Sequence, residues 1–162
     1  MAGGNRSYQS GATIIVVDAA NEIIDWVYFE KTRSEMGPAF IRVLSYFHED
    51  GTKSIAQIEE AMRQQNTVGL VIPAHTLKGE ARQFGANPVA TVAELIESTA
   101  RICIETKRFP DELVKDVVEL RRLFQETIQL FDKATNPLRS RGPQPVAGGF
   151  GRKVTNQGFG RL

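Results

Sequence analysis

Apolar residues recur at intervals of three and four through most of the chain after residue 20, where no alternating strand pattern appears. The longest such series consists of Leu113, Val117, Leu120, Phe124, Ile128 and Phe131. This spacing places large apolar side chains on one face of a helix of about six turns. Faces of this kind are buried by packing one helix against another, so the sequence predicts an all-α fold.

Residues that begin or end helices divide this pattern into segments. These breaks fall at Gly37-Pro38, at Asn66 or Thr67, at Asn87-Pro88 and within RFPDEL (108–113). They predict an antiparallel four-helix bundle with short loops and an additional N-terminal helix packed against it. We also expect Gly51 to interrupt or bend the helix that begins near Phe40.

Two core faces follow from the same spacing. In the leading helix we expect Trp26 to be a packing anchor beside an apolar series of Ile23, Ile24, Val27 and Tyr28. In the helix after Pro88 we expect the core side to carry Val92, Leu95, Ile96, Thr99, Ile102 and Cys103.

The composition is that of a globular domain with tails. The chain has 162 residues, of which 41% are hydrophobic and 24% are charged. We expect a leader over residues 1–20, a helical bundle over 21–135 and a tail over 136–162. The tail is rich in Gly, Pro and Arg and repeats GFGR, a composition that predicts flexibility.

Charge and cysteine content narrow the classes of partner. The net charge is +1, and five basic residues lie after residue 135 without an acid, so residues 1–135 carry −4. This balance makes nucleic acid an unlikely partner. The single cysteine and the short apolar run IIVV (14–17), without a basic leader, predict a cytoplasmic protein that does not enter a membrane.

One of the two histidines lies in PAHTLKGEARQFGA (73–86). On a helical wheel, Leu70, Ala74, Leu77, Ala81 and Phe84 form a narrow core stripe. His75 lies about 140° from the centre of that stripe, and Lys78, Gly79 and Arg82 share its outer side. The spacing therefore predicts a histidine that faces solvent.

The neighbours of His75 suit nucleophilic chemistry at a phosphoryl group. A free imidazole has a pKa of about 6.5, so much of it is unprotonated near pH 7 and can attack. Lys78 is one turn away and can balance phosphate charge, while Gly79 leaves room for a second protein. No carboxylate that would orient the ring is evident on this face, and we predict no metal site, because His48 and Cys103 fall on other helices. Arg101 is expected in a surface ion pair, with an approach to the phosphoryl group as the alternative.

The segment AHTLKGEARQFGA resembles the motif of histidine phosphotransfer (HPt) domains, roughly His-x-Leu-Lys-Gly-small-small-x-x-Leu-Gly-Ala. The residues that match in register are His75, Leu77, Lys78, Gly79, Gly85 and Ala86, with Phe84 in place of leucine. The resemblance implies a four-helix bundle and a phosphorelay intermediate. His75 would be the phosphoacceptor, Lys78 would stabilise the phosphoryl group and Gly79 would give steric access.

The same resemblance implies the partners. A hybrid or sensor histidine kinase, or a receiver aspartate, would phosphorylate His75, and a response-regulator receiver domain would take the group onward. We expect Arg82 and Gln83 to contact the partner. The chain shows no GxxxxGK[ST] loop, so we expect a phosphocarrier without autokinase activity and not an enzyme. No cofactor is expected in this chain, because Mg²⁺ would lie on the partner receiver.

Two departures from the motif predict local differences. Glu80 replaces a small residue, but the wheel points it away from His75. Pro73 removes a helical hydrogen bond to Gly69, which predicts a kink or irregular turn over 69–73.

Other functions compete with phosphotransfer. One is a helical adaptor that binds receiver domains without transfer, and another is nucleic-acid binding through the basic tail. A dimer that builds its bundle from two hairpins is a third arrangement, but one chain holds enough helices, so we expect a monomer.

Overall fold

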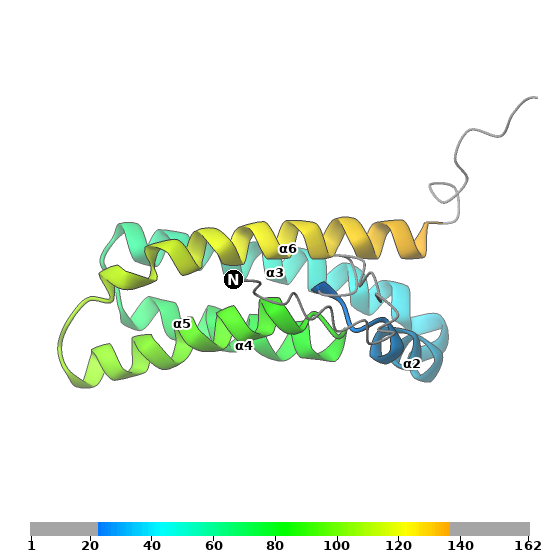
Figure 1. The fold of residues 1–162 in the computed structure, drawn as a ribbon, viewed down its shortest axis with the longest axis horizontal. Coiled ribbons are helices and arrows are strands. Elements are labelled where there is room, and N and C mark those ends of the chain that lie inside the picture. The colour runs from blue at the N-terminus through cyan, green and yellow to red at the C-terminus, as the bar shows by residue number, and fades with distance from the viewer. Residues whose placement is uncertain (1–22, 137–162) are drawn as a thin grey trace, which may run out of the picture.

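Four long helices run alternately up and down in the computed structural model, which describes residues 23–136 (Figure 1). They are α3 (Phe40–Arg63), α4 (Val71–Gln83), α5 (Asn87–Glu105) and α6 (Val114–Thr135). Short 3₁₀ turns precede α3, α4 and α6, namely η1 (Gly37–Ala39), η2 (Val68–Leu70) and η3 (Asp111–Leu113). The predicted all-α antiparallel bundle is confirmed, and no strand occurs between residues 23 and 136.

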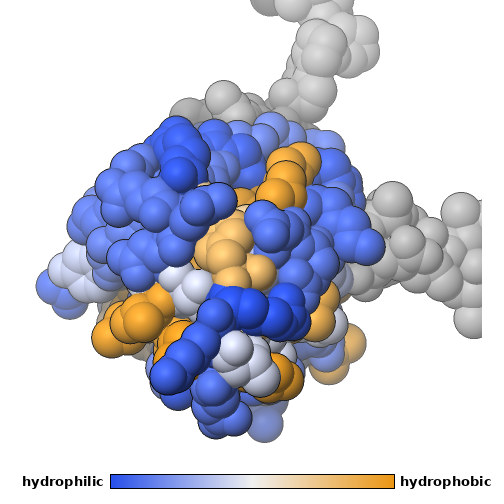
Figure 2. Space-filling model, turned by 90° about the vertical axis from the view of Figure 1, so that its left-hand side faces the viewer, coloured by the Kyte–Doolittle hydropathy of each residue, from blue (hydrophilic) through white to orange (hydrophobic). Residues whose placement is uncertain are grey.

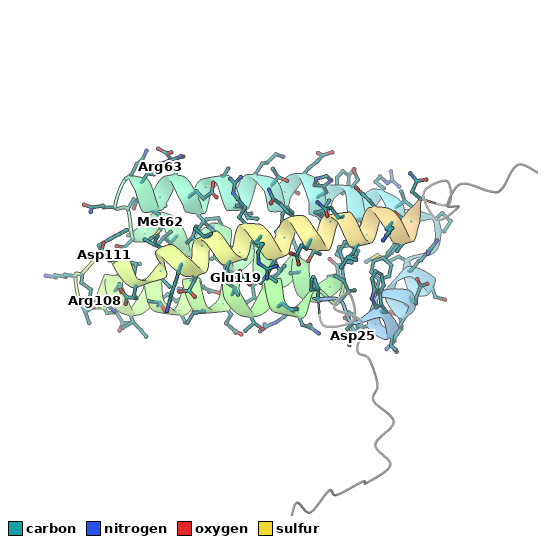
Figure 3. The ribbon with its side chains drawn as sticks, turned by 45° about the horizontal axis from the view of Figure 1, so that its top comes forward. Asp25, Met62, Arg63, Arg108, Asp111 and Glu119 are labelled. Atoms are coloured by element: carbon teal, nitrogen blue, oxygen red, sulfur yellow. The ribbon has the colours of Figure 1, made fainter. Side chains whose placement is uncertain are left out.

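The helices form a ring in the order α3, α4, α5, α6, and α4 with α5 makes the most extensive contact. The N-terminal helix α2 (Trp26–Met36) lies across one end of the bundle, as predicted (Figure 1). Asp25 marks this end in Figure 3, and Arg108 and Asp111 mark the opposite end. The ring places the α4–α5 seam on the side of the bundle opposite α3 and α6.

The leading helix packs through a different face from the one predicted. Val27 is 85% exposed and Tyr28 is also exposed, whereas Phe29 is fully buried. The Phe29 ring lies 5.1 Å from the ring of Phe40 and 4.8 Å from that of Phe131. The helix begins only at Trp26, after an Asp25 cap. Ile24 lies before the helix and is buried as predicted, and Ile23 packs against the core. Trp26 does pack edge-to-face on Phe29, which confirms it as an anchor.

Gly51 does not interrupt its helix, contrary to prediction. Helix α3 continues from Phe40 to Arg63, and Gly51 is buried within it. A Cβ atom added at Gly51 would lie 2.5 Å from the ring of Phe124 on α6. The glycine therefore allows α6 to pack closely on the middle of α3.

Helix α5 also buries a different face from the predicted one. Leu95 and Ile102 are exposed, while Ile96 and Cys103 are buried as expected. The buried residues of α5 are Val89, Ala90, Ala93, Ile96, Glu97, Ala100 and Cys103. Three of these seven residues are alanines, and their small side chains allow α5 to pack closely on α4, which contributes the buried Ala74 and Ala81. Large apolar side chains were thus a misleading guide to the core side.

The end of the bundle marked by Arg108 and Asp111 exposes little continuous apolar surface. Figure 2 looks at this end and shows apolar residues as separate patches among hydrophilic ones. Within residues 23–136, no helix is both long and apolar enough to cross a bilayer. The predicted leader (1–20) and nearly all of the predicted tail (136–162) lie outside the described residues.

Candidate functional site

The turn before α4 sets the start of the helix that carries the histidine. Asn66 caps this turn, since its side-chain oxygen accepts from the Gly69 amide at 3.0 Å. The 3₁₀ turn η2 follows and regular helix begins at Val71, so Pro73 falls in the first turn of α4. Proline is tolerated there because the first helical N–H groups have few intrahelical acceptors. An irregular turn was predicted over 69–73, and the structure places it at 68–70.

The core stripe of α4 is as predicted from the wheel. All of its members are at most 1% exposed, namely Leu70, Ala74, Leu77, Ala81 and Phe84. His75 lies on the outer side, with 63% of its side chain exposed. A buried structural role for this histidine is therefore excluded.

Glu97 of α5 holds the imidazole from the neighbouring helix. Its Oε1 lies 3.0 Å from Nδ1 of His75, and its Oε2 accepts from Nζ of Lys78 at 2.7 Å. Arg101, one turn further along α5, donates to the same Oε1 from Nη2 at 2.9 Å. The Glu97 side chain is only 8% exposed, and its carboxylate binds His75, Lys78 and Arg101.

These contacts settle the ionisation of Glu97 and the ring tautomer. Burial by itself raises the pKa of the Glu97 carboxyl, but hydrogen bonds from Lys78, Arg101 and His75 outweigh burial and lower it to about 2. An ionised carboxylate can only accept hydrogen bonds, so Nδ1 of His75 carries the proton. The neutral ring then has its free lone pair on Nε2.

The cations at the site differ in exposure. The Lys78 side chain is only 17% exposed, and its ammonium is held by Glu97 with Glu94 at 3.9 Å. Arg101 is 57% exposed and pairs with Glu97 four residues before it. Arg101 forms an ion pair, as predicted, but its partner is the buried carboxylate that also binds His75 and not a surface group, so Arg101 lies at the site.

The two glycines of the motif have different structural reasons. A Cβ atom at Gly79 would meet no atom within 4 Å in the described structure, so the fold itself does not require glycine there. Gly85 has a φ of +74°, and a Cβ atom would approach the Asp25 carbonyl to 2.8 Å. The Asp25 amide also donates to the Gly85 carbonyl at 2.9 Å. Gly85 therefore follows the end of α4 and allows the residue that caps α2 to pack against it, whereas Gly79 leaves the surface beside His75 open.

The remaining predicted residues lie near the end of α4. Arg82 is half exposed and donates to Glu94 at 2.7 Å. Gln83 is the last, exposed residue of α4. Glu80 points away from His75, as predicted, toward α3. Burial, with a smaller effect from the charge of Asp50, raises the pKa of Glu80.

We predicted no carboxylate that orients the His75 ring, and this prediction was wrong. Glu97 supplies one from another helix, and a wheel of α4 alone contains no information on it. A signal was present in the sequence of α5, because Glu97 lies between Ala93 and Ala100 on what is the buried face. A carboxylate in such a position needs partners, which points to a site.

No group of three or more His, Cys, Asp or Glu side chains that could hold a metal occurs between residues 23 and 136. His48 is exposed on α3, and Cys103 is buried as a core residue. A surface hollow of about 460 Å³ lies between α3 and α6, away from His75, and its lining includes His48, Ile55, Arg121 and Gln125.

Comparison with known proteins agrees with this geometry. The Hpt domain family model matches residues 42–131, which is more than half of the chain. The fold is similar to the crystal structure of histidine-containing phosphotransfer protein B (HptB) from Pseudomonas aeruginosa PAO1. That match has a TM-score of 0.60 and 20% sequence identity, and it covers 69% of this chain and 93% of the other. No curated protein sequence matches the chain.

The family match spans the helices that hold His75, Lys78 and Glu97, and the structural likeness independently supports the bundle. The chain belongs to the Hpt domain family, the histidine phosphotransfer domains of phosphorelays.

Proposed function

We propose that the chain is a phosphorelay intermediate in which Nε2 of His75 accepts a phosphoryl group from a receiver aspartate or a histidine kinase. The group then passes to the aspartate of a response-regulator receiver domain. The observation that carries this proposal is the exposed His75 ring, whose Nδ1 is bound to Glu97 at 3.0 Å. This contact leaves Nε2 as the nucleophile.

Transfer is an in-line displacement at phosphorus. The lone pair of Nε2 forms the new bond as the bond to the aspartyl oxygen breaks, and that electron pair returns to the carboxylate. The Lys78 ammonium, close to the ring through their shared contact with Glu97, offsets the charge of the phosphoryl oxygens. The partner receiver would supply Mg²⁺, and this chain would supply no cofactor.

Access for the partner depends on the open surface beside His75. Gly79 is the next residue on that side of the helix, and open space surrounds it in the described structure. We propose that the receiver approaches over Gly79 and contacts the exposed Arg82 and Gln83. In this role the chain is a phosphocarrier in the cytoplasm, without phosphorylation of itself from ATP.

The test is transfer from a panel of phosphorylated receiver domains to the wild type and to His75→Gln. We expect label on the wild type only, stable in base and lost in acid, as for a phosphoramidate. His48→Gln is the matched control and should be labelled like the wild type, because His48 lies on α3. Label on His75→Gln would remove His75 from the mechanism, and no label on any protein would favour a non-transferring adaptor.

A further inference from the structure

We propose that Glu97 is a positioning residue that keeps a proton on Nδ1 of His75 after phosphorylation, so that the phosphorylated ring is a phosphoimidazolium. The inference rests on the proposed phosphoacceptor role of His75. It adds that Glu97 makes His75 a reactive phosphoryl donor as well as an acceptor.

The geometry keeps Glu97 in place while the ring reacts. Its Oε2 is bound by Lys78 from α4 at 2.7 Å, and its Oε1 is bound by Arg101 from α5 at 2.9 Å. Only 8% of the side chain is exposed. A carboxylate fixed from both helices cannot turn away when Nε2 gains a phosphoryl group, so its contact with Nδ1 persists.

The charges around the ring favour the protonated form once phosphate is present. The cluster contains three basic and two acidic side chains, a formal charge of +1, namely Lys78, Arg82, Arg101, Glu94 and Glu97. A phosphoryl group adds a charge of about −2 near pH 7, by analogy with phosphoserine. A proton retained on Nδ1 therefore brings the site to neutrality.

In the described part of the chain, no side chain of η2, α3 or α6 forms an ion pair with the cluster. The 3₁₀ turn η2 has no titratable side chain. On the α3 side of α4, Asp50 lies near Glu80, which faces away from His75. In residues 23–136, every ion pair made by the five charged residues of the cluster stays within α4 and α5.

Proton retention simplifies both chemical steps. In acceptance, Nε2 bonds to phosphorus and the bond from phosphorus to the donor oxygen breaks, which leaves a cationic ring that still has its Nδ1 proton. In donation, the bond between Nε2 and phosphorus breaks and its electron pair returns to Nε2. The leaving group is then neutral imidazole. Without the Nδ1 proton, the leaving group would be an imidazolate, a far poorer one.

The experiment uses the full chain phosphorylated with potassium phosphoramidate, a small donor that needs no partner protein. The ¹⁵N shift of Nδ1 in phosphorylated His75 is followed with pH in the wild type and in Glu97→Gln. Glu105→Gln is the matched control, since it removes an exposed α5 carboxylate that lies outside the cluster. Loss of the charged acceptor should move the deprotonation midpoint down by about one pH unit in Glu97→Gln, with the control unchanged.

A second readout is the rate at which the phosphoryl group is lost near pH 8. We expect loss up to about tenfold slower from Glu97→Gln than from the wild type, since a one-unit downward shift lowers the protonated fraction by that factor once the pH is above both midpoints. A midpoint in Glu97→Gln within 0.3 pH unit of the wild type would overturn the inference and leave the acceptor role intact.

The wild type gives an independent test if Glu97→Gln does not fold. A phosphorylated wild-type ring that has lost its Nδ1 proton at pH 7 also overturns the inference. If phosphoramidate adds no label at His75 in the wild type beyond that found on His75→Gln, the proposed function fails, and the inference with it.

Discussion

The carboxylate of Glu97 lies 3.0 Å from Nδ1 of His75, although the two residues are 22 positions apart and belong to different helices. The contact depends on how closely α4 and α5 approach, and alanines at Ala74, Ala93 and Ala100 permit that approach. The hydrogen bonding of the His75 ring is thus a feature of the α4–α5 seam and not of α4 alone.

Removal of the Lys78 charge should slow phosphotransfer. Lys78→Met keeps most of the side-chain stem but loses the cation, and we expect roughly tenfold slower transfer from a phosphorylated receiver. The loss is smaller than the 10²–10³ found when a donor is removed from a water-excluded site, because His75 is open to solvent. Lys53→Met is the control, since Lys53 pairs with Asp50 on α3. Equal rates for Lys78→Met and the wild type would contradict a role for this cation.

A side chain at Gly79 should block the partner without harm to the fold. The Cβ atom of the leucine in Gly79→Leu would have no other atom within 4 Å. Because leucine has a higher helix propensity than glycine, the free energy of unfolding should rise by up to about 1 kcal/mol. Transfer from a receiver should fall at least tenfold, while phosphorylation by phosphoramidate should stay at the wild-type rate. If both rates fall together, Gly79 acts on the ring itself and not on access.

Glu97 should make the stability of the bundle depend on pH. Its pKa is about 2 in the folded chain against an ordinary value of 4.5. The stabilisation is therefore complete above about pH 4.5 and is lost as the pH falls toward 2. The shift corresponds to about 3 kcal/mol as an order of magnitude. Denaturant unfolding between pH 6 and 2 should show a flatter profile for Glu97→Gln, and an unchanged profile would contradict the assignment.

Gly51→Ala should destabilise the bundle, in contrast to Gly79→Ala. The new Cβ would lie 2.5 Å from the Phe124 ring, which is buried and must shift. Overpacking of this kind costs about 1–3 kcal/mol, partly offset by the gain in helix propensity. Thermal unfolding of the two variants compares the same substitution at a packed and an open helical position. Equal melting temperatures would contradict this prediction, because they would show that Phe124 can shift without loss of stability.

The chain should be a monomer in solution. Its own α3, α4, α5 and α6 close the four-helix ring, so no helix from a second copy is needed. Sedimentation equilibrium at micromolar concentrations should give the mass of one chain. A stable dimer would contradict this expectation.

Helical spacing alone predicted which residues of α4 share a face. The period of a helix fixes the angle between Leu77 and His75, so the core stripe of α4 and the exposed ring followed from spacing alone. The same reasoning located the buried face of α6, from Val117 to Phe131. The motif around His75 then indicated the family that the comparison confirmed.

The spacing of large apolar side chains did not locate the core side of α2 or α5. Val27, Leu95 and Ile102 are large and apolar yet exposed. The short helix α2 packs through Phe29 instead, and α5 packs through a face that includes three alanines. The structure shows that Gly51 allows close packing of Phe124 and does not interrupt α3.

The surroundings of the histidine were likewise decided by tertiary structure. The contact of Glu97 with His75, and the capture of Lys78 and Arg101 by the same carboxylate, depend on the distance, angle and register between α4 and α5. Helical periodicity orders residues along one axis, but it does not fix how a second axis lies beside the first. That placement follows from the packing of the whole core.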